Sequence, residues 1–103
     1  MPGWATYHIE RLQNDEATVK FRPRGNSMSG KIESGQLVTV VPITDPNKLR
    51  VGDIVLCKVS GREYLHLIGA VQHGRFRIEN NHGKINGWIG ADQIYGKCIQ
   101  VEP

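Results

Sequence analysis

Short apolar runs rich in β-branched residues, separated by glycine-containing turns, make up most of the chain. Runs of this length and composition are typical of β-strands. The pattern predicts strands at residues 17–21, 37–41, 54–59, 63–68, 75–79 and about 94–101. Residues 80–83 (Asn-Asn-His-Gly) and the pair Asn86-Gly87 both predict turns. The pair is the commonest in a type I′ hairpin turn, because its two residue types favour a left-handed backbone.

One segment has the periodicity of a helix instead. Ala5, Ile9 and Leu12 recur at intervals of four and three residues, which favours a short amphipathic helix over roughly residues 4 to 13. No internal repeat, low-complexity tract or linker divides the rest of the chain. We therefore expect a single domain over residues 1–103, all-β (β-dominated) with one short N-terminal helix.

Charge and hydropathy narrow the classes of partner. The chain has 103 residues and a net charge of +3, with Lys20, Arg22 and Arg24 as its densest positive cluster. So small an excess does not favour nucleic acid as a partner. No stretch approaches the about 20 apolar residues that cross a bilayer, and the N-terminus has no apolar signal segment. We expect a cytoplasmic protein in which Cys57 and Cys98 are free thiols, although the sequence leaves a disulfide between them open.

The segment Gly25-Asn26-Ser27-Met28 is the first candidate for chemistry. Glycine allows a backbone with positive φ, so the serine that follows can stand exposed on a tight turn. Backbone N–H groups on such a turn can point toward a developing oxyanion. Taken alone, however, a serine among glycine and asparagine is more often an ordinary turn residue.

His66 is the second candidate. In the run 64–68, alternation places Leu65 and Leu67 on one face of a strand and His66 on the other. A histidine in this position is either a hydrogen-bonded core residue or a general base on the concave face of a sheet.

The order of these motifs resembles the S24/S26 superfamily of serine peptidases. That superfamily contains the signal peptidases and the self-cleaving domains of bacterial and phage repressors of the LexA type. The resemblance covers roughly residues 19 to 101. Its most specific parts are residues 25–28 (Gly-Asn-Ser-Met), 34–38 (Ser-Gly-Gln-Leu-Val) and 49–55 (Leu-Arg-Val-Gly-Asp-Ile-Val). It implies a coiled mixed β-sheet like that of the LexA and signal peptidase catalytic domain.

The resemblance also implies a serine peptidase site. Ser27 matches the nucleophile, and His66 falls at the position of the base, where bacterial relatives carry lysine and archaeal and endoplasmic-reticulum signal peptidases carry histidine. The oxyanion hole would be formed by the N–H of Ser27, with help from Gly25 and Asn26. Histidine has an ordinary pKa of about 6.5, so activity should rise as the pH passes through that value.

A third group normally orients the other ring nitrogen of such a histidine. Relatives with histidine carry acidic residues downstream, where this chain has the segment Ile78-Glu79-Asn80-Asn81-His82. Glu79, Asn80 and Asn81 are therefore the predicted orienting residues, and a simple Ser27–His66 dyad is the central expectation.

The predicted reaction is hydrolysis of a peptide bond in a polypeptide substrate, without cofactor or metal. His73 and His82 stand in predicted turns, and with His66 and the cysteines they do not form a recognised metal spacing. The alternative is a catalytically silent, phage-repressor-like or regulatory module that binds a protein partner through the same fold. The sequence also leaves formation of a homodimer open.

Overall fold

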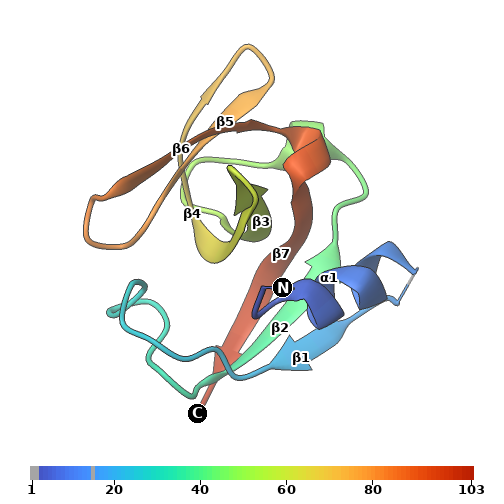
Figure 1. The fold of residues 1–103 in the computed structure, drawn as a ribbon, viewed down its shortest axis with the longest axis vertical. Helices are drawn as coiled ribbons and strands as arrows, with labels where there is room; N and C mark the ends of the chain where they lie inside the picture. The colour runs from blue at the N-terminus through green and yellow to red at the C-terminus, as the bar shows by residue number, and fades with distance from the viewer. Residues whose placement is uncertain (1–2, 15) are drawn as a thin grey trace.

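The computed structural model describes residues 3–14 and 16–103, and within them seven strands form one antiparallel sheet (Figure 1). The helix is α1 (Thr6–Gln13), and the strands are β1 (Val19–Phe21), β2 (Leu37–Pro42), β3 (Ile54–Val59), β4 (Arg62–Gln72), β5 (Arg75–Glu79), β6 (Ile85–Gly90) and β7 (Ile94–Glu102). Two short 3₁₀ turns, η1 (Pro46–Lys48) and η2 (Ala91–Gln93), precede β3 and β7. The predicted β-dominated fold with one short N-terminal α-helix is confirmed.

The strand order is β1-β2-β7-β3-β4-β5-β6. Each pair of neighbouring strands in the described residues is antiparallel, so the sheet is not mixed as the resemblance implied. The reason is the connectivity. Short turns join β3 to β4, β4 to β5 and β5 to β6. Strand β7 lies between β2 and β3 and is antiparallel to both.

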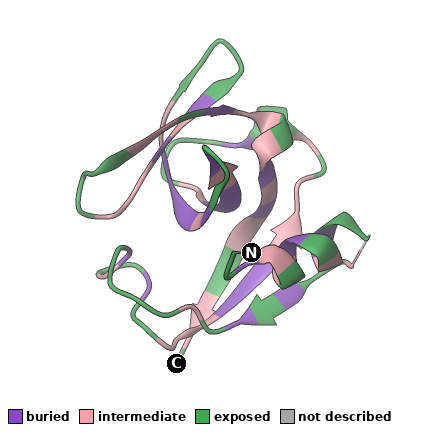
Figure 2. Ribbon diagram, in the orientation of Figure 1, coloured by how far each residue is buried: buried purple, intermediate pink, exposed green. Residues whose placement is uncertain are grey.

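The two central strands, β3 and β4, are buried on both faces (Figure 2). On one face, Leu56 and Leu65 belong to a core that also takes in α1, β1, β2 and part of the loop that carries Ser27. On the other face, Val55 and Ile68 belong to a second core built with β5, β6 and the start of β7. A strand held from both sides is a rigid platform, and β4 is the strand that carries His66.

Helix α1 begins two residues later than its pattern predicts. Its first turn is tied to β4 by the carboxylate of Glu63, which accepts hydrogen bonds from the Ala5 N–H and the Thr6 hydroxyl, both at 2.6 Å. The buried side chains of Ile9 and Leu12 then hold the helix against the sheet. The predicted apolar face is therefore correct, and the helix starts where the carboxylate holds it.

The predicted turn at Asn86-Gly87 is wrong. Both residues lie inside β6, and the hairpin between β5 and β6 turns earlier, where the Asn80 N–H donates to the carbonyl of Lys84. Gly87 pairs with Ile78, and Ile85 pairs with Glu79, so Asn86 is an extra residue in β6. This is a β-bulge, and Gly87, with φ +148°, supplies the unusual backbone that it needs.

Candidate active site

Ser27 lies on a tight loop that two contacts hold in place. Met28 and Ile32 bury their side chains in the first core, and a helical-type bond from the Ile32 N–H to the Met28 carbonyl closes the loop at 2.8 Å. Gly25 enters the loop with φ +114°, a conformation that other residues rarely adopt. The predicted exposed serine on a glycine turn is what the structure shows.

Asn81 ties the same loop to the hairpin between β5 and β6. Its backbone N–H donates to the Ser27 carbonyl at 2.9 Å, and its side-chain amide donates to the Ser29 carbonyl at 2.7 Å. The backbone of the Ser27 loop is therefore held against the hairpin between β5 and β6, although the loop itself is exposed.

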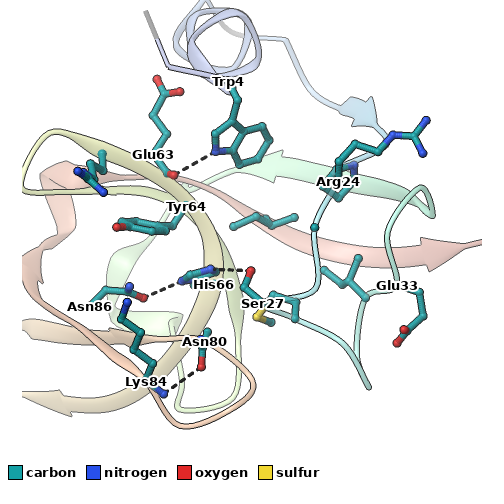
Figure 3. Close-up of a pocket in the computed structure, with 16 residues that line it drawn as sticks. Trp4, Arg24, Ser27, Glu33, Glu63, Tyr64, His66, Asn80, Lys84 and Asn86 are labelled. Carbon is teal, nitrogen blue, oxygen red and sulfur yellow. Dashed lines mark hydrogen bonds between the residues drawn. The ribbon is translucent and has the colours of Figure 1, made fainter.

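The structure brings Ser27 and His66 together from positions 39 residues apart (Figure 3). The His66 Nε2 lies 3.1 Å from the Ser27 Oγ, and the His66 Nδ1 lies 2.7 Å from the Asn86 Oδ1. Because the Asn86 carbonyl oxygen only accepts, Nδ1 carries the ring proton and Nε2 presents a lone pair to the serine hydroxyl. This is the tautomer that a general base needs.

Burial also changes the pKa of His66. Only 6% of the residue is exposed, and this burial lowers the pKa of His66 from its usual value of 6.5, while the hydrogen bond to Asn86 raises it and offsets part of the effect. A buried imidazole resists protonation because the charged form loses its hydration. The ring is therefore neutral, and able to accept a proton, at neutral pH.

None of the three predicted orienting residues reaches His66. The Glu79 carboxylate pairs with Arg77 at 3.3 Å and packs over Gly69, where a Cβ would collide with it. The Asn80 side-chain oxygen accepts the N–H groups of His82 and Lys84 in the hairpin turn. Asn81, as described above, holds the Ser27 loop.

Asn86 takes the orienting position instead. Sequence reasoning missed it because Asn-Gly is the commonest hairpin-turn pair, which assigned both residues to a loop. The same pair also suits a bulge whose second residue has positive φ, and a bulge redirects the side chain of its extra residue. In β6 that extra residue is Asn86, and its side chain is turned toward His66.

Of the three N–H groups predicted for an oxyanion hole, one is already hydrogen-bonded within the protein. The Gly25 N–H donates to the Ser34 Oγ at 3.1 Å, so it is turned away from the serine hydroxyl. Within the described residues, the N–H groups of Ser27 and Asn26 have no protein acceptor. These two remain the donors that could meet an oxyanion.

A groove of about 400 Å³ runs past Ser27 and His66. One wall is the first half of β4, and the other is the segment that leads into the serine loop, including Arg24 and Gly25. Its apolar lining includes Met28, Ile32 and Leu65, which also belong to the first core.

The β4 wall is an unpaired strand edge. Residues 62–66 pair with β3 alone, because the pairing with β5 begins at Leu67. The Ile68 N–H donates to the Asp53 carbonyl on the β3 side, so alternate residues of β4 turn their backbone groups the other way. Leu65 and Glu63 therefore present backbone N–H and C=O groups to the groove.

The sequence also bears on two further features, a metal site and a membrane-spanning segment. No group of three or more His, Cys, Asp or Glu side chains there could hold a metal ion. None of the helices described is long and apolar enough to cross a membrane. No protein-family model matches this chain, and no curated protein matches it.

Proposed function

We propose that this protein is a serine peptidase in which Ser27 is the nucleophile and His66 the general base. The observation that carries the proposal is the pair of contacts on one imidazole, 3.1 Å to the Ser27 Oγ and 2.7 Å to the Asn86 Oδ1. A structural histidine needs partners, but these two contacts fix the tautomer and aim the lone pair at a hydroxyl that lines a groove.

In the proposed reaction, His66 Nε2 takes the proton of the Ser27 hydroxyl as Oγ attacks the carbonyl carbon of a peptide bond. The tetrahedral intermediate collapses when the imidazolium gives this proton to the leaving amine, and an acyl-enzyme on Ser27 remains. Water, deprotonated by the same nitrogen, attacks the ester; the acid product leaves and Ser27 regains its proton.

Asn86 is the third member of the site. It holds Nδ1 protonated throughout, as the asparagine does in the Cys-His-Asn sites of papain-like proteases. A neutral amide stabilises the imidazolium less than a carboxylate would. The resting histidine is therefore easily kept neutral, in the form that can accept the serine proton. The N–H groups of Ser27 and Asn26 are the proposed oxyanion donors.

The shape of the groove favours a polypeptide over a small ester as the substrate. An extended chain can add to the exposed edge of β4 by pairing with the N–H and C=O of Leu65, which places its backbone beside Ser27. The apolar lining, which includes Met28, Ile32 and Leu65, would take one small side chain. Every step of the mechanism uses side chains, backbone groups and water, so it requires no cofactor.

The free thiols fit the proposed cytoplasmic location. Cys57 and Cys98 are both unpaired, as expected for cysteines in a reducing compartment.

The test is covalent labelling of Ser27 by a fluorophosphonate, followed by peptide mapping with mass spectrometry. We expect labelling of Ser27 in the parent protein and none in Ser27→Ala or His66→Ala. Ser29→Ala is the matched control, because its hydroxyl belongs to the same loop but bonds to the Asn26 carbonyl.

The alternative, a catalytically silent module that binds a partner through the β4 edge, gives a different result. His66→Ala would then label as fast as the parent, or Ser27 would not label at all. The observation that favours this alternative is Asn86, a neutral residue at the position where an acidic residue would stabilise the imidazolium better.

A further inference from the structure

The segment before α1 is attached to the groove wall by a single residue of β4. The buried Glu63 carboxylate accepts hydrogen bonds from the Ala5 N–H and the Thr6 hydroxyl, each at 2.6 Å. The Glu63 backbone carbonyl accepts a third bond, from the indole Nε1–H of Trp4, at 3.0 Å (Figure 3). Gly3 passes so close to this carboxylate that a Cβ there would collide with it.

The indole bond occupies a particular point on the strand edge. Glu63 is the next residue after Leu65 whose backbone groups turn toward the groove, about 7 Å further along β4 at 3.3 Å per residue. A peptide that pairs with Leu65 and continues along the edge needs the Glu63 carbonyl as its next acceptor. In this structure that carbonyl is already bonded to Trp4.

The ring itself is also an obstacle. Trp4 lines the groove, and its ring packs against Phe21 with centroids 5.8 Å apart, while 51% of the residue is exposed. Trp4 also lines a second, smaller hollow, together with His8, Phe21 and Arg22. The indole is therefore a shared lining residue of the groove and this hollow.

We propose that Trp4 is a specificity-determining residue that ends the peptide-binding edge of β4. The site then accepts a chain segment that pairs with Leu65, and it excludes one that continues past Glu63 unless the indole is displaced. This inference rests on the proposed function of the groove. The proposed substrate is a polypeptide that binds along β4 on one side of its scissile bond. On that side, only a short segment of the substrate pairs with the strand.

The experiment compares short and long peptides as competitors of fluorophosphonate labelling of Ser27. The probes are a pool of random blocked tripeptides and a pool of random blocked octapeptides. In the parent protein we expect the octapeptides to compete no better than the tripeptides. In Trp4→Ala they should compete about tenfold better, the equivalent of one backbone hydrogen bond, while the tripeptides are unchanged.

Two further variants separate the causes. Trp4→Phe keeps an aromatic ring but loses the Nε1–H. If octapeptides compete better in this variant than in the parent but less well than in Trp4→Ala, both the bulk of the ring and its hydrogen bond limit binding. Trp88→Ala removes the other tryptophan, which lies on β6 outside the groove, and should leave competition as in the parent. Equal competition by octapeptides in parent and Trp4→Ala overturns the proposal.

A second measurement does not depend on catalysis. In ¹⁵N-labelled Ser27→Ala protein, the octapeptide pool should shift the Leu65 amide while the Trp4 indole N–H keeps its hydrogen bond to Glu63, seen as unchanged exchange with solvent. If the octapeptides release the indole, or if neither pool binds, the proposal is wrong. If Ser27 is never labelled but the amide shifts with the indole retained, the peptidase assignment fails and the role of Trp4 stands.

Discussion

At the scale of single residues, the imidazole of His66 contacts both Ser27, the proposed nucleophile, and Asn86, the proposed orienting residue. Burial lowers the pKa of His66, so its base form persists to more acidic pH than that of a solvated histidine. We expect the rate of Ser27 labelling to rise with pH, with a midpoint below 6.5, the usual value. In Asn86→Asp the midpoint should move upward, because a carboxylate stabilises the imidazolium. A profile that rises only above pH 7 would contradict this assignment.

Asn86 itself gives a second prediction. Removing its side chain frees the His66 ring to rotate and to bind the proton on either nitrogen. Asn86→Ala should therefore reduce the rate of Ser27 labelling by about 10- to 100-fold, the usual cost of a misplaced catalytic group. Glu79→Gln is the matched control, because Glu79 is the acidic residue of the segment predicted to orient His66 but pairs with Arg77 instead. Equal losses in both variants would show that the loss comes from the fold and not from orientation.

These two cases show how far the residues of the site follow from sequence. Ser27 and His66 are predicted as a pair from the order of the motifs, because neither the glycine turn nor the strand alone singles out its residue. Asn86 is not, because its role depends on the register between β5 and β6, which places the bulge. Register arises from contacts between distant residues, and a dipeptide pattern does not contain them.

At the scale of elements, α1 is stable only through its contacts with the sheet, which are the packing of Ile9 and Leu12 and the attachment of its first turn to β4. A helix of eight residues is too short to persist alone in water. Glu63→Ala should leave the buried Ala5 N–H without an acceptor and lower the free energy of unfolding by about 1–3 kcal/mol, measured by urea denaturation. Glu33→Ala is the control, because its carboxylate also accepts a backbone N–H, that of Gly30, but in an exposed position. A loss as large in the control would contradict the role assigned to burial.

The apolar periodicity of α1 and of six of the seven strands is sufficient to predict these elements, whereas β6 is missed because Asn86-Gly87 predicts a turn there. It could not predict that half of β4 has no neighbour on one side, since pairing partners lie far apart in the chain. That unpaired edge, and the tryptophan that covers part of it, are properties of the assembled sheet.

At the scale of the whole molecule, two cores share the central strands, so the most buried groups should be exposed only by global unfolding. Cys57 is fully buried, and burial raises its pKa to about 12. We expect iodoacetamide to modify Cys98, which is partly exposed, while Cys57 reacts only as fast as the protein unfolds. Mass spectrometry of each cysteine across a urea series would measure this. Modification of Cys57 well before the unfolding transition would show that the second core opens locally.

The stability of the whole molecule should depend on pH through two histidines. Burial is the main cause that lowers the pKa of His66, and also that of His8, where Arg11 adds to the effect and Glu63 opposes it. In the unfolded chain both should titrate near the usual 6.5, so on acidification the unfolded state binds protons first. The free energy of unfolding should therefore be highest above pH 6.5 and fall as the pH drops from there toward the folded pKa values. Urea midpoints at pH 7.5, 6.5 and 5.5 would measure the fall, and His66→Gln should make it shallower because one of the two titrations is gone. A midpoint that stays constant or rises on acidification would contradict the burial of these rings in their neutral form.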